Sequence, residues 1–234
     1  DSTGRPNKID PIQYKFIEEL KTVEKDTSFT LESIRNFRNM IMHSSHAKDL
    51  HTPNEAAFFI LVKLKAEREN QGQIDENIIS SIRNKYPHIE ISKQDSLWKA
   101  ADIFRGANFS KVPKNQLLDT IEQVFMFDKQ YMGQFDLPKW LSTFMVKLSD
   151  IKSGDRVLNL NVGLGRILAA ISIEAQSFKD ITLFGQEENQ SFGVWSILPS
   201  FIFANSLPNM LWESSHFYHE DYSKVICAPP FGGR

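Results

Sequence analysis

Cysteine is nearly absent from this sequence. Among 234 residues there is one, Cys227, which excludes a disulfide framework and indicates a reducing compartment, so we predict a cytoplasmic protein. Cys227 falls on a short apolar segment, and we interpret its thiol as core packing and not as a nucleophile. Long apolar runs are also missing. No stretch of the sequence is apolar for long enough to cross a bilayer, so no membrane partner is expected.

Net charge is low as well. A value of -2 does not by itself favour nucleic acid as a partner, because phosphate binding draws on a basic surface. One basic stretch stands out, with aromatic side chains interleaved: Trp98, Lys99, Phe104, Arg105, Phe109, Lys111 and Lys114. It is either a surface for stacking and phosphate binding or an amphipathic helix with solvated lysines, and we favour the helix.

The first ninety residues carry helical patterns. With 41% hydrophobic and 24% charged residues, the chain can fill two modest cores. Apolar spacing and capping signals predict helices over 11–25, 31–44, 54–70 and 75–85. We therefore predict an all-helical N-terminal domain over residues 1–92.

The second predicted helix contains Arg38-Asn39-Met40-Ile41-Met42-His43, which resembles the Arg-Asn-x-x-x-His signature of HEPN domains. In ribonucleases of that family the Arg and the His cleave RNA by acid-base chemistry, which implies this role for Arg38 and His43. The alternative is an ordinary solvated helix face. His43, His46 and His51 lack an accompanying acid at ligand spacing, so no metal site is predicted.

A glycine loop marks the second half of the chain. Residues 156–162 are expected to form a buried strand, after which Gly163 and Gly165 allow a tight turn into a helix at about Arg166. A second strand is expected over 180–187, ending at Glu187. A carboxylate at that place in such folds accepts hydrogen bonds from ribose hydroxyls. The alternative is a solvated acid at the end of the strand.

A third strand-and-turn pattern, Lys224–Cys227 followed by Ala228-Pro229-Pro230-Phe231, stands near the end of the chain. Together with Gly133–Pro138, the glycine loop and Phe184–Asn189, it resembles the ordered motifs of N6-adenine-specific DNA methyltransferases. The likeness is to the modification subunits of type I restriction-modification systems. It implies S-adenosylmethionine as cofactor, DNA as substrate, and a DNA-specificity subunit and a restriction subunit as partners.

The resemblance also implies residue roles. The implied cofactor-binding residues are Phe135, Pro138, Asn159, Gly163, Gly165 and Glu187. The residues that would hold a flipped adenine are Ala228, Pro229, Pro230 and Phe231, with Phe231 stacking on the base.

The motifs depart from the family where the chemistry occurs. Ala228 replaces an Asn or Asp whose oxygen accepts a hydrogen bond from the adenine amine. Losing such a group costs on the order of a hundredfold in rate. Asn159 replaces Asp, Leu137 replaces Thr, and Asn161 is also altered. The enzyme is expected to be impaired or inactive, a pseudo-methyltransferase that binds DNA or acts as a scaffold, either by natural loss, which we favour, or by an engineered exchange at Ala228.

The predicted fold class is therefore α/β. The helical domain over 1–92 is followed by a helical lead-in over 93–132 and by a Rossmann-like methyltransferase domain over 133–234. Since a complete sheet of this kind has further strands, we expect the domain to be truncated after its fourth strand. The rest would belong to a longer polypeptide or be supplied by another chain.

Overall fold

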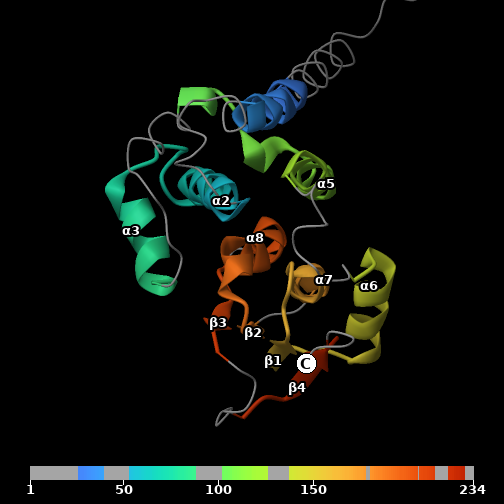
Figure 1. Cartoon of the computed structure of the whole chain (residues 1–234). Coiled ribbons are helices and arrows are strands. Elements are labelled where there is room, and N and C mark those ends of the chain that lie inside the picture. The colour runs from blue at the N-terminus through green and yellow to red at the C-terminus, as the bar shows by residue number, and fades with distance from the viewer. Residues whose placement is uncertain are drawn as a thin grey trace, which may run out of the picture.

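The structure is a computed structural model that describes residues 26–39, 53–87, 102–125, 137–177, 180–204, 206–213 and 221–229. Helices occupy the N-terminal part, and a parallel sheet with covering helices occupies the C-terminal part (Figure 1). The mixed α/β class predicted from the sequence is confirmed. The predicted helix over 11–25 lies outside the described residues. None of the described helices is long and apolar enough to span a membrane.

The N-terminal part contains a helix over residues 26–39 together with α2 (Pro53–Glu69), α3 (Glu76–Lys85), the 3-10 turn η1 (Phe109–Lys111) and α5 (Lys114–Phe125). The predictions over 54–70 and 75–85 are confirmed to within a residue. Asp75 caps α3 by accepting a hydrogen bond from the amide of Ile78, as expected of a carboxylate at that position.

The first described helix differs from its prediction, since it is helical from residue 26 and not from 31. Its polar first turns explain the difference. The hydroxyls of Thr30 and Ser33 donate to the carbonyls of Asp26 and Phe29, each four residues earlier and each at 2.9 Å. These side chains are satisfied inside the helix, so a polar stretch that suggests a turn can remain helical.

The sheet has four parallel strands in the order β3-β2-β1-β4: β1 (Arg156–Leu160), β2 (Thr182–Gln186), β3 (Asn209–Leu211) and β4 (Lys224–Cys227). The chain moves outward from β1 to β3 and then returns to pair β4 with the other side of β1. The gap between β1 and β4 is therefore a topological switch point, where ligands of open α/β sheets bind.

The three predicted strands agree with the structure to within two residues, since β2 runs over 182–186 and not over 180–187. The strand predicted over Lys224–Cys227 is confirmed. β1 ends at Leu160, two residues before the predicted end, because Asn161 adopts a left-handed conformation with φ of 55°. Such a residue turns the chain out of the extended conformation.

Three helices accompany the sheet: α6 (Lys139–Leu148), α7 (Arg166–Glu174) and α8 (Gly193–Phe203). α7 packs between α6 and α8, while α8 lies between α7 and α2 (Figure 1). Since α8 has neighbours on both sides, all its residues with described side chains are buried. This explains an apolar sequence that shows no polar face.

The C-terminal end of α8 is held by side chains from other helices. Arg68 of α2 donates three hydrogen bonds of 2.6 to 3.1 Å to its last carbonyls and lies 4.3 Å from the ring centre of Phe201. Lys114 and Gln176 both donate to the carbonyl of Phe203 at 3.0 Å. Burial lowers the pKa of Arg68 and of Lys114. These bonds satisfy carbonyls that a helix end otherwise leaves without partners.

One apolar core joins the two parts of the chain. It contains buried residues of the helix over 26–39, of α2, α3 and α5, and the apolar face of α8. A second core lies around α6, α7 and the sheet. The predicted boundaries near residues 92 and 132 fall outside the described residues and stay predictions.

Candidate functional site

The carboxyl ends of β1, β2 and β4 surround a glycine loop that joins β1 to α7. Asn161, Gly163 and Gly165 have φ of 55°, 54° and 76°, all in the left-handed region. Glycine adopts this conformation without strain, and asparagine adopts it more easily than most residues. The alternation of left-handed residues folds the loop tightly over the end of the sheet before α7 begins.

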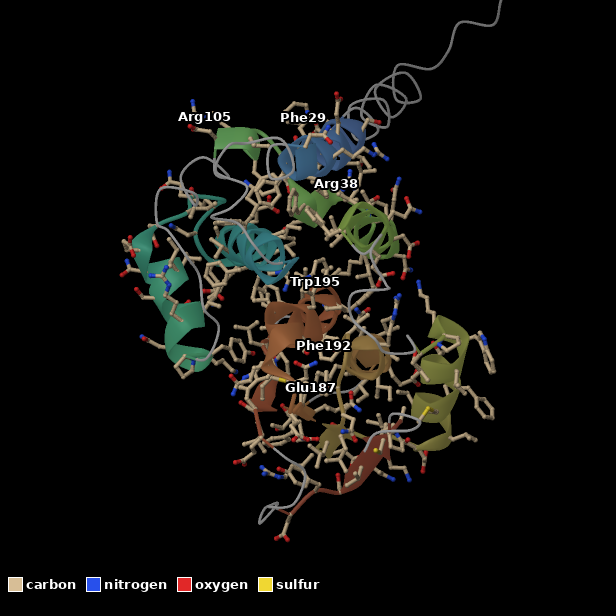
Figure 2. All side chains as sticks on the ribbon, viewed as in Figure 1. Phe29, Arg38, Arg105, Glu187, Phe192 and Trp195 are labelled. Carbon is tan, nitrogen blue, oxygen red and sulfur yellow. The ribbon has the colours of Figure 1, made fainter. Side chains whose placement is uncertain are left out.

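Glu187 lies directly after β2 and is 5% exposed. One carboxylate oxygen accepts a hydrogen bond from the amide of Gly163 at 2.7 Å, and the other accepts one from the amide of Asn189 at 2.8 Å. Figure 2 shows Glu187 below α8, near the strand ends. The alternative of a solvated strand-end acid is wrong. A carboxylate offers about four acceptor sites, so roughly two remain for a ligand.

Gln186, the last residue of β2, builds the first turn of the loop and was not assigned a role from the sequence. Its carbonyl accepts from the amide of Val162 at 2.9 Å, and its side-chain oxygen accepts from the amide of Asn161 at 3.2 Å. The side chain is fully buried. A glutamine next to an acid at the end of an apolar strand was the signal that could have identified it.

Gly165 has a packing role. A Cβ atom at this position would lie 2.4 Å from the carbonyl oxygen of Ser196 in α8 and 3.3 Å from that of Trp195. The hydroxyl of Ser196 donates to the carbonyl of Gly163 at 2.7 Å. Gly165 therefore lets α8 approach the loop closely, and its predicted contact with a cofactor stays a prediction.

The replacement of Asp by Asn at position 159 is explained by hydrogen bonds that an ionised acid could not make. Its amide group donates to the carbonyls of Leu160 and Ile226 at 3.0 and 3.1 Å, which ties β1 to β4 across the switch point. An ionised Asp has no donor. The side chain is fully buried, and its Oδ1 has no hydrogen-bond partner among the described residues.

The end of β4 is mainly apolar. Ala228 is half-buried and packs against the second core together with Leu137, while Pro229 is exposed. Pro230, Phe231 and Phe135 lie outside the described residues. Pro138 precedes α6 and is exposed.

Cys227, the last residue of β4, contacts the glycine loop. Its thiol donates to Oδ1 of Asn161 at 3.5 Å, and burial raises the pKa of the thiol. A raised pKa keeps sulfur protonated at neutral pH, which disfavours a nucleophilic role.

The remaining sequence candidates lie in the N-terminal part. Arg38 is half-buried near the end of the helix over 26–39, but its proposed partner His43 lies outside the described residues. The ribonuclease hypothesis therefore stays a prediction. No cluster of three or more metal-ligating side chains occurs within the residues that the structure describes.

The interpretation of the basic stretch as a surface for base stacking is wrong. Phe104 and Phe109 are each 1% exposed, with ring centres 5.1 Å apart. They belong to the core and cannot stack on bases. The favoured amphipathic helix is also wrong in part, because residues 104–106 form a turn and residues 107–108 have no regular structure before η1. Trp98 and Lys99 lie outside the described residues.

Comparisons with known proteins give little further information. No family model matches the chain, and no curated protein sequence matches it. Among solved structures, it is similar to the type I restriction-modification system methyltransferase subunit from Streptococcus thermophilus, with a TM-score of 0.45 and 11% identity. The match covers 88% of this chain and 63% of that subunit. A likeness at this TM-score and identity does not bear on activity.

Proposed function

We propose that this chain is a methyltransferase-like domain that binds S-adenosylmethionine at the carboxyl ends of β1 and β2. One observation carries the proposal. Glu187 is a buried carboxylate directly after β2, the strand that pairs with β1. It accepts a hydrogen bond from the amide of Gly163, which lies in a glycine loop with left-handed backbone angles. In open α/β sheets, an acid and a glycine loop in this relation hold the ribose and the adjoining part of a nucleotide-like ligand.

The residues present fit the adenosine part of this cofactor. Glu187 keeps acceptor sites for two ribose hydroxyls, and the loop around Gly163 leaves backbone close to that place. Asn159 adds an oxygen that has no partner among the described residues. When bound, the cofactor would supply an electrophilic methyl group.

Methyl transfer by the chain alone is not expected to be efficient. An adenine amine must be held by hydrogen-bond acceptors to react, and Ala228 has none in its side chain. Ala228 packs against the apolar core together with Leu137. We therefore propose that the domain retains binding and has weak or no turnover. Its proposed partners are DNA, a DNA-specificity subunit and a restriction subunit, in keeping with the motif resemblance.

A calorimetric titration of the folded chain with S-adenosylmethionine tests the cofactor site. We expect micromolar binding, with Glu187→Gln at least about tenfold weaker because the neutral amide accepts weaker hydrogen bonds and tends to release the Gly163 loop. Glu188→Gln is the matched control, since Glu188 is the exposed neighbour. The absence of binding by a cooperatively folded chain, or equal losses in both variants, would contradict the proposal.

The variant Ala228→Asn tests the proposed lack of turnover. We expect that transfer of labelled methyl groups to adenine-containing DNA stays at background level, because Leu137 and Asn159 also depart from the family pattern. Unchanged cofactor binding in the same variant would show that its site is intact. Methylation well above background would instead mean that a single residue silences an otherwise competent enzyme, and the pseudoenzyme proposal would be abandoned.

A further inference from the structure

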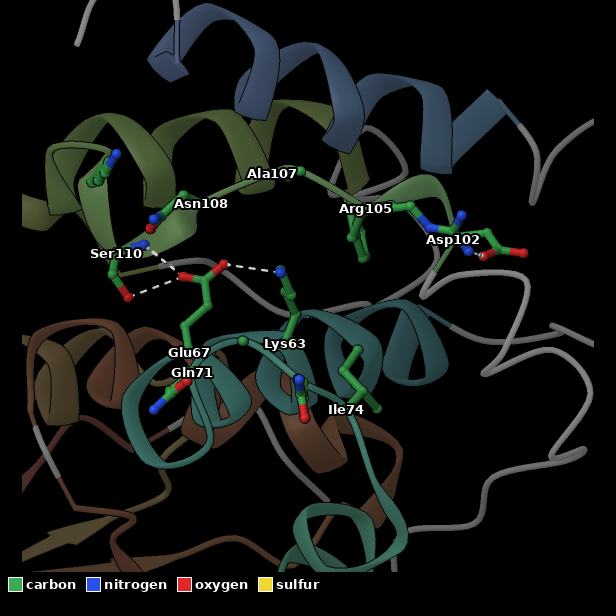
Figure 3. Close-up of a pocket in the computed structure, with 14 residues that line it drawn as sticks. Lys63, Glu67, Gln71, Ile74, Asp102, Arg105, Ala107, Asn108 and Ser110 are labelled. Atoms are coloured by element: carbon green, nitrogen blue, oxygen red, sulfur yellow. Dashed lines mark hydrogen bonds and ion pairs between the residues drawn. The ribbon is translucent and has the colours of Figure 1, made fainter. Parts of the chain in front are cut away.

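A cavity lies in the N-terminal part, away from the strand ends. Its volume is about 860 Å³, which is within the range of small-molecule sites. It lies between the second half of α2, the turn over 71–74 and the segment over 102–111 (Figure 3). Among the described residues, none that lines it comes from the sheet or from the helices α6 to α8.

Two buried charges form part of the cavity wall. The side chains of Lys63 and Glu67 are 9% and 6% exposed, and Nζ of Lys63 lies 3.3 Å from Oε1 of Glu67. The Glu67 carboxylate also accepts three hydrogen bonds of 2.8 to 3.0 Å, from the amides of Phe109 and Ser110 and from the Ser110 hydroxyl. It therefore fixes the segment over 109–110 against α2.

Lys63 has hydrogen-bonding capacity left over. An ammonium group carries three donors, and its one ion pair within the described residues is with Glu67. Figure 3 shows its nitrogen directed from α2 into the space beneath the chain around Ala107. A buried cation with unfilled donors is costly unless an acceptor joins it. This makes an anion the natural ligand for the deep end of the cavity.

Two further cations stand at the rim. The Arg105 and Lys111 side chains are 82% and 54% exposed, and they pair with the exposed acids Asp102 and Asp26 at 2.6 and 3.2 Å. Exposed ion pairs of this kind contribute roughly 0 to 1 kcal/mol, so either cation can exchange its partner for a ligand at little cost. Both residues line the same cavity as Lys63.

We propose that this cavity binds a small phosphorylated molecule. Its phosphate group contacts Lys63 at the deep end, while the cations of Arg105 and Lys111 at the rim attract the anion. The side-chain amides of Gln71 and Gln73, which also line the cavity, bond the hydroxyl groups of the ligand body. A phosphate group suits this place because it offers several acceptor oxygens and more than one negative charge.

The test is a titration of the intact chain with ribose 5-phosphate at low ionic strength, followed by calorimetry, with unphosphorylated ribose as the ligand control. Lys63 lines this cavity and not the strand-end site, so the effect of Lys63→Gln distinguishes binding here from binding of the ribose at Glu187. We expect saturable binding of the phosphorylated sugar and none of ribose. Arg105→Gln should weaken binding about fivefold, and Lys63→Gln at least about tenfold.

Lys147→Gln is the matched control, because Lys147 is an exposed lysine on α6 outside the cavity, and it should leave the affinity unchanged. Should Lys63→Gln fail to fold, Lys111→Gln takes its place with an expected loss of about fivefold. The proposal is overturned if ribose 5-phosphate shows no saturable binding, if ribose binds equally well, or if Lys147→Gln weakens binding as much as Arg105→Gln does.

Discussion

At the scale of single residues, the site combines groups that the sequence identifies with groups that it does not. Glu187 and Gly163 could be predicted, because an acid at a strand end and a glycine after a strand have known roles. Their direct hydrogen bond at 2.7 Å could not be predicted. At position 159 the motif resemblance shows only that Asn replaces Asp. In the structure the amide of Asn159 joins β1 to β4, which the sequence does not indicate because the fold sets the strand that pairs with β1.

Gly165 and Gly154 offer a comparison between two left-handed glycines. Both have φ near 80°, but a Cβ on Gly154 meets nothing within 4 Å, whereas one on Gly165 meets the Ser196 carbonyl at 2.4 Å. Gly154→Ala should therefore cost about 1 to 2 kcal/mol of unfolding free energy from backbone strain alone. Gly165→Ala should cost about 2 kcal/mol more, because α8 must move. Urea denaturation measures both, and equal losses would mean that α8 does not press on the loop.

At the scale of elements, α8 depends on its surroundings. It is buried along its length and contains Pro199, which has no amide to donate to the carbonyl of Trp195 four residues earlier. Its end is satisfied by side chains from α2, α5 and the segment after α7. The sequence predicts an apolar segment here. It does not indicate which distant cations complete the helix.

Arg68→Met tests this dependence. The substitution keeps much of the aliphatic packing but removes three hydrogen bonds to the end of α8. We expect a loss of about 2 to 4 kcal/mol in unfolding free energy, because buried carbonyls are left without partners. Arg105→Met is the control, since that side chain is 82% exposed, and its effect should stay within about 0.5 kcal/mol. Similar small changes in both variants would show that water replaces the guanidinium at no cost.

At the scale of the whole molecule, the N-terminal helices and the sheet part are joined through a shared core. The apolar residues of α2 and α5 belong to the same cluster as those of α8, and Arg166 at the start of α7 forms an ion pair with Glu122 of α5 at 2.5 Å. Both side chains of this pair are largely buried. We therefore expect the described parts to unfold together.

Native-state hydrogen exchange checks this expectation. Phe59 of α2 is 2% exposed and contacts Phe37 at a ring-centre distance of 5.6 Å. Phe59→Ala should cost about 3 to 5 kcal/mol. In a single cooperative unit, protection falls by the same free energy for amides of α2 and of α7. Lower protection in α2 with unchanged protection in α7 would show two independently folding domains, as the sequence-based boundary near residue 92 suggests.

Local patterns in the amino-acid sequence were enough to predict several elements of this protein. Residue spacing and capping gave α2, α3 and β4 to within a residue, and the glycine loop located the start of α7, because these features depend on neighbours in the chain. Three features could not be predicted in this way: Phe104 and Phe109 are core residues, Asn159 bridges two strands, and Lys63 and Glu67 form part of a cavity wall. Each of these depends on contacts between segments far apart in sequence, which no local pattern records.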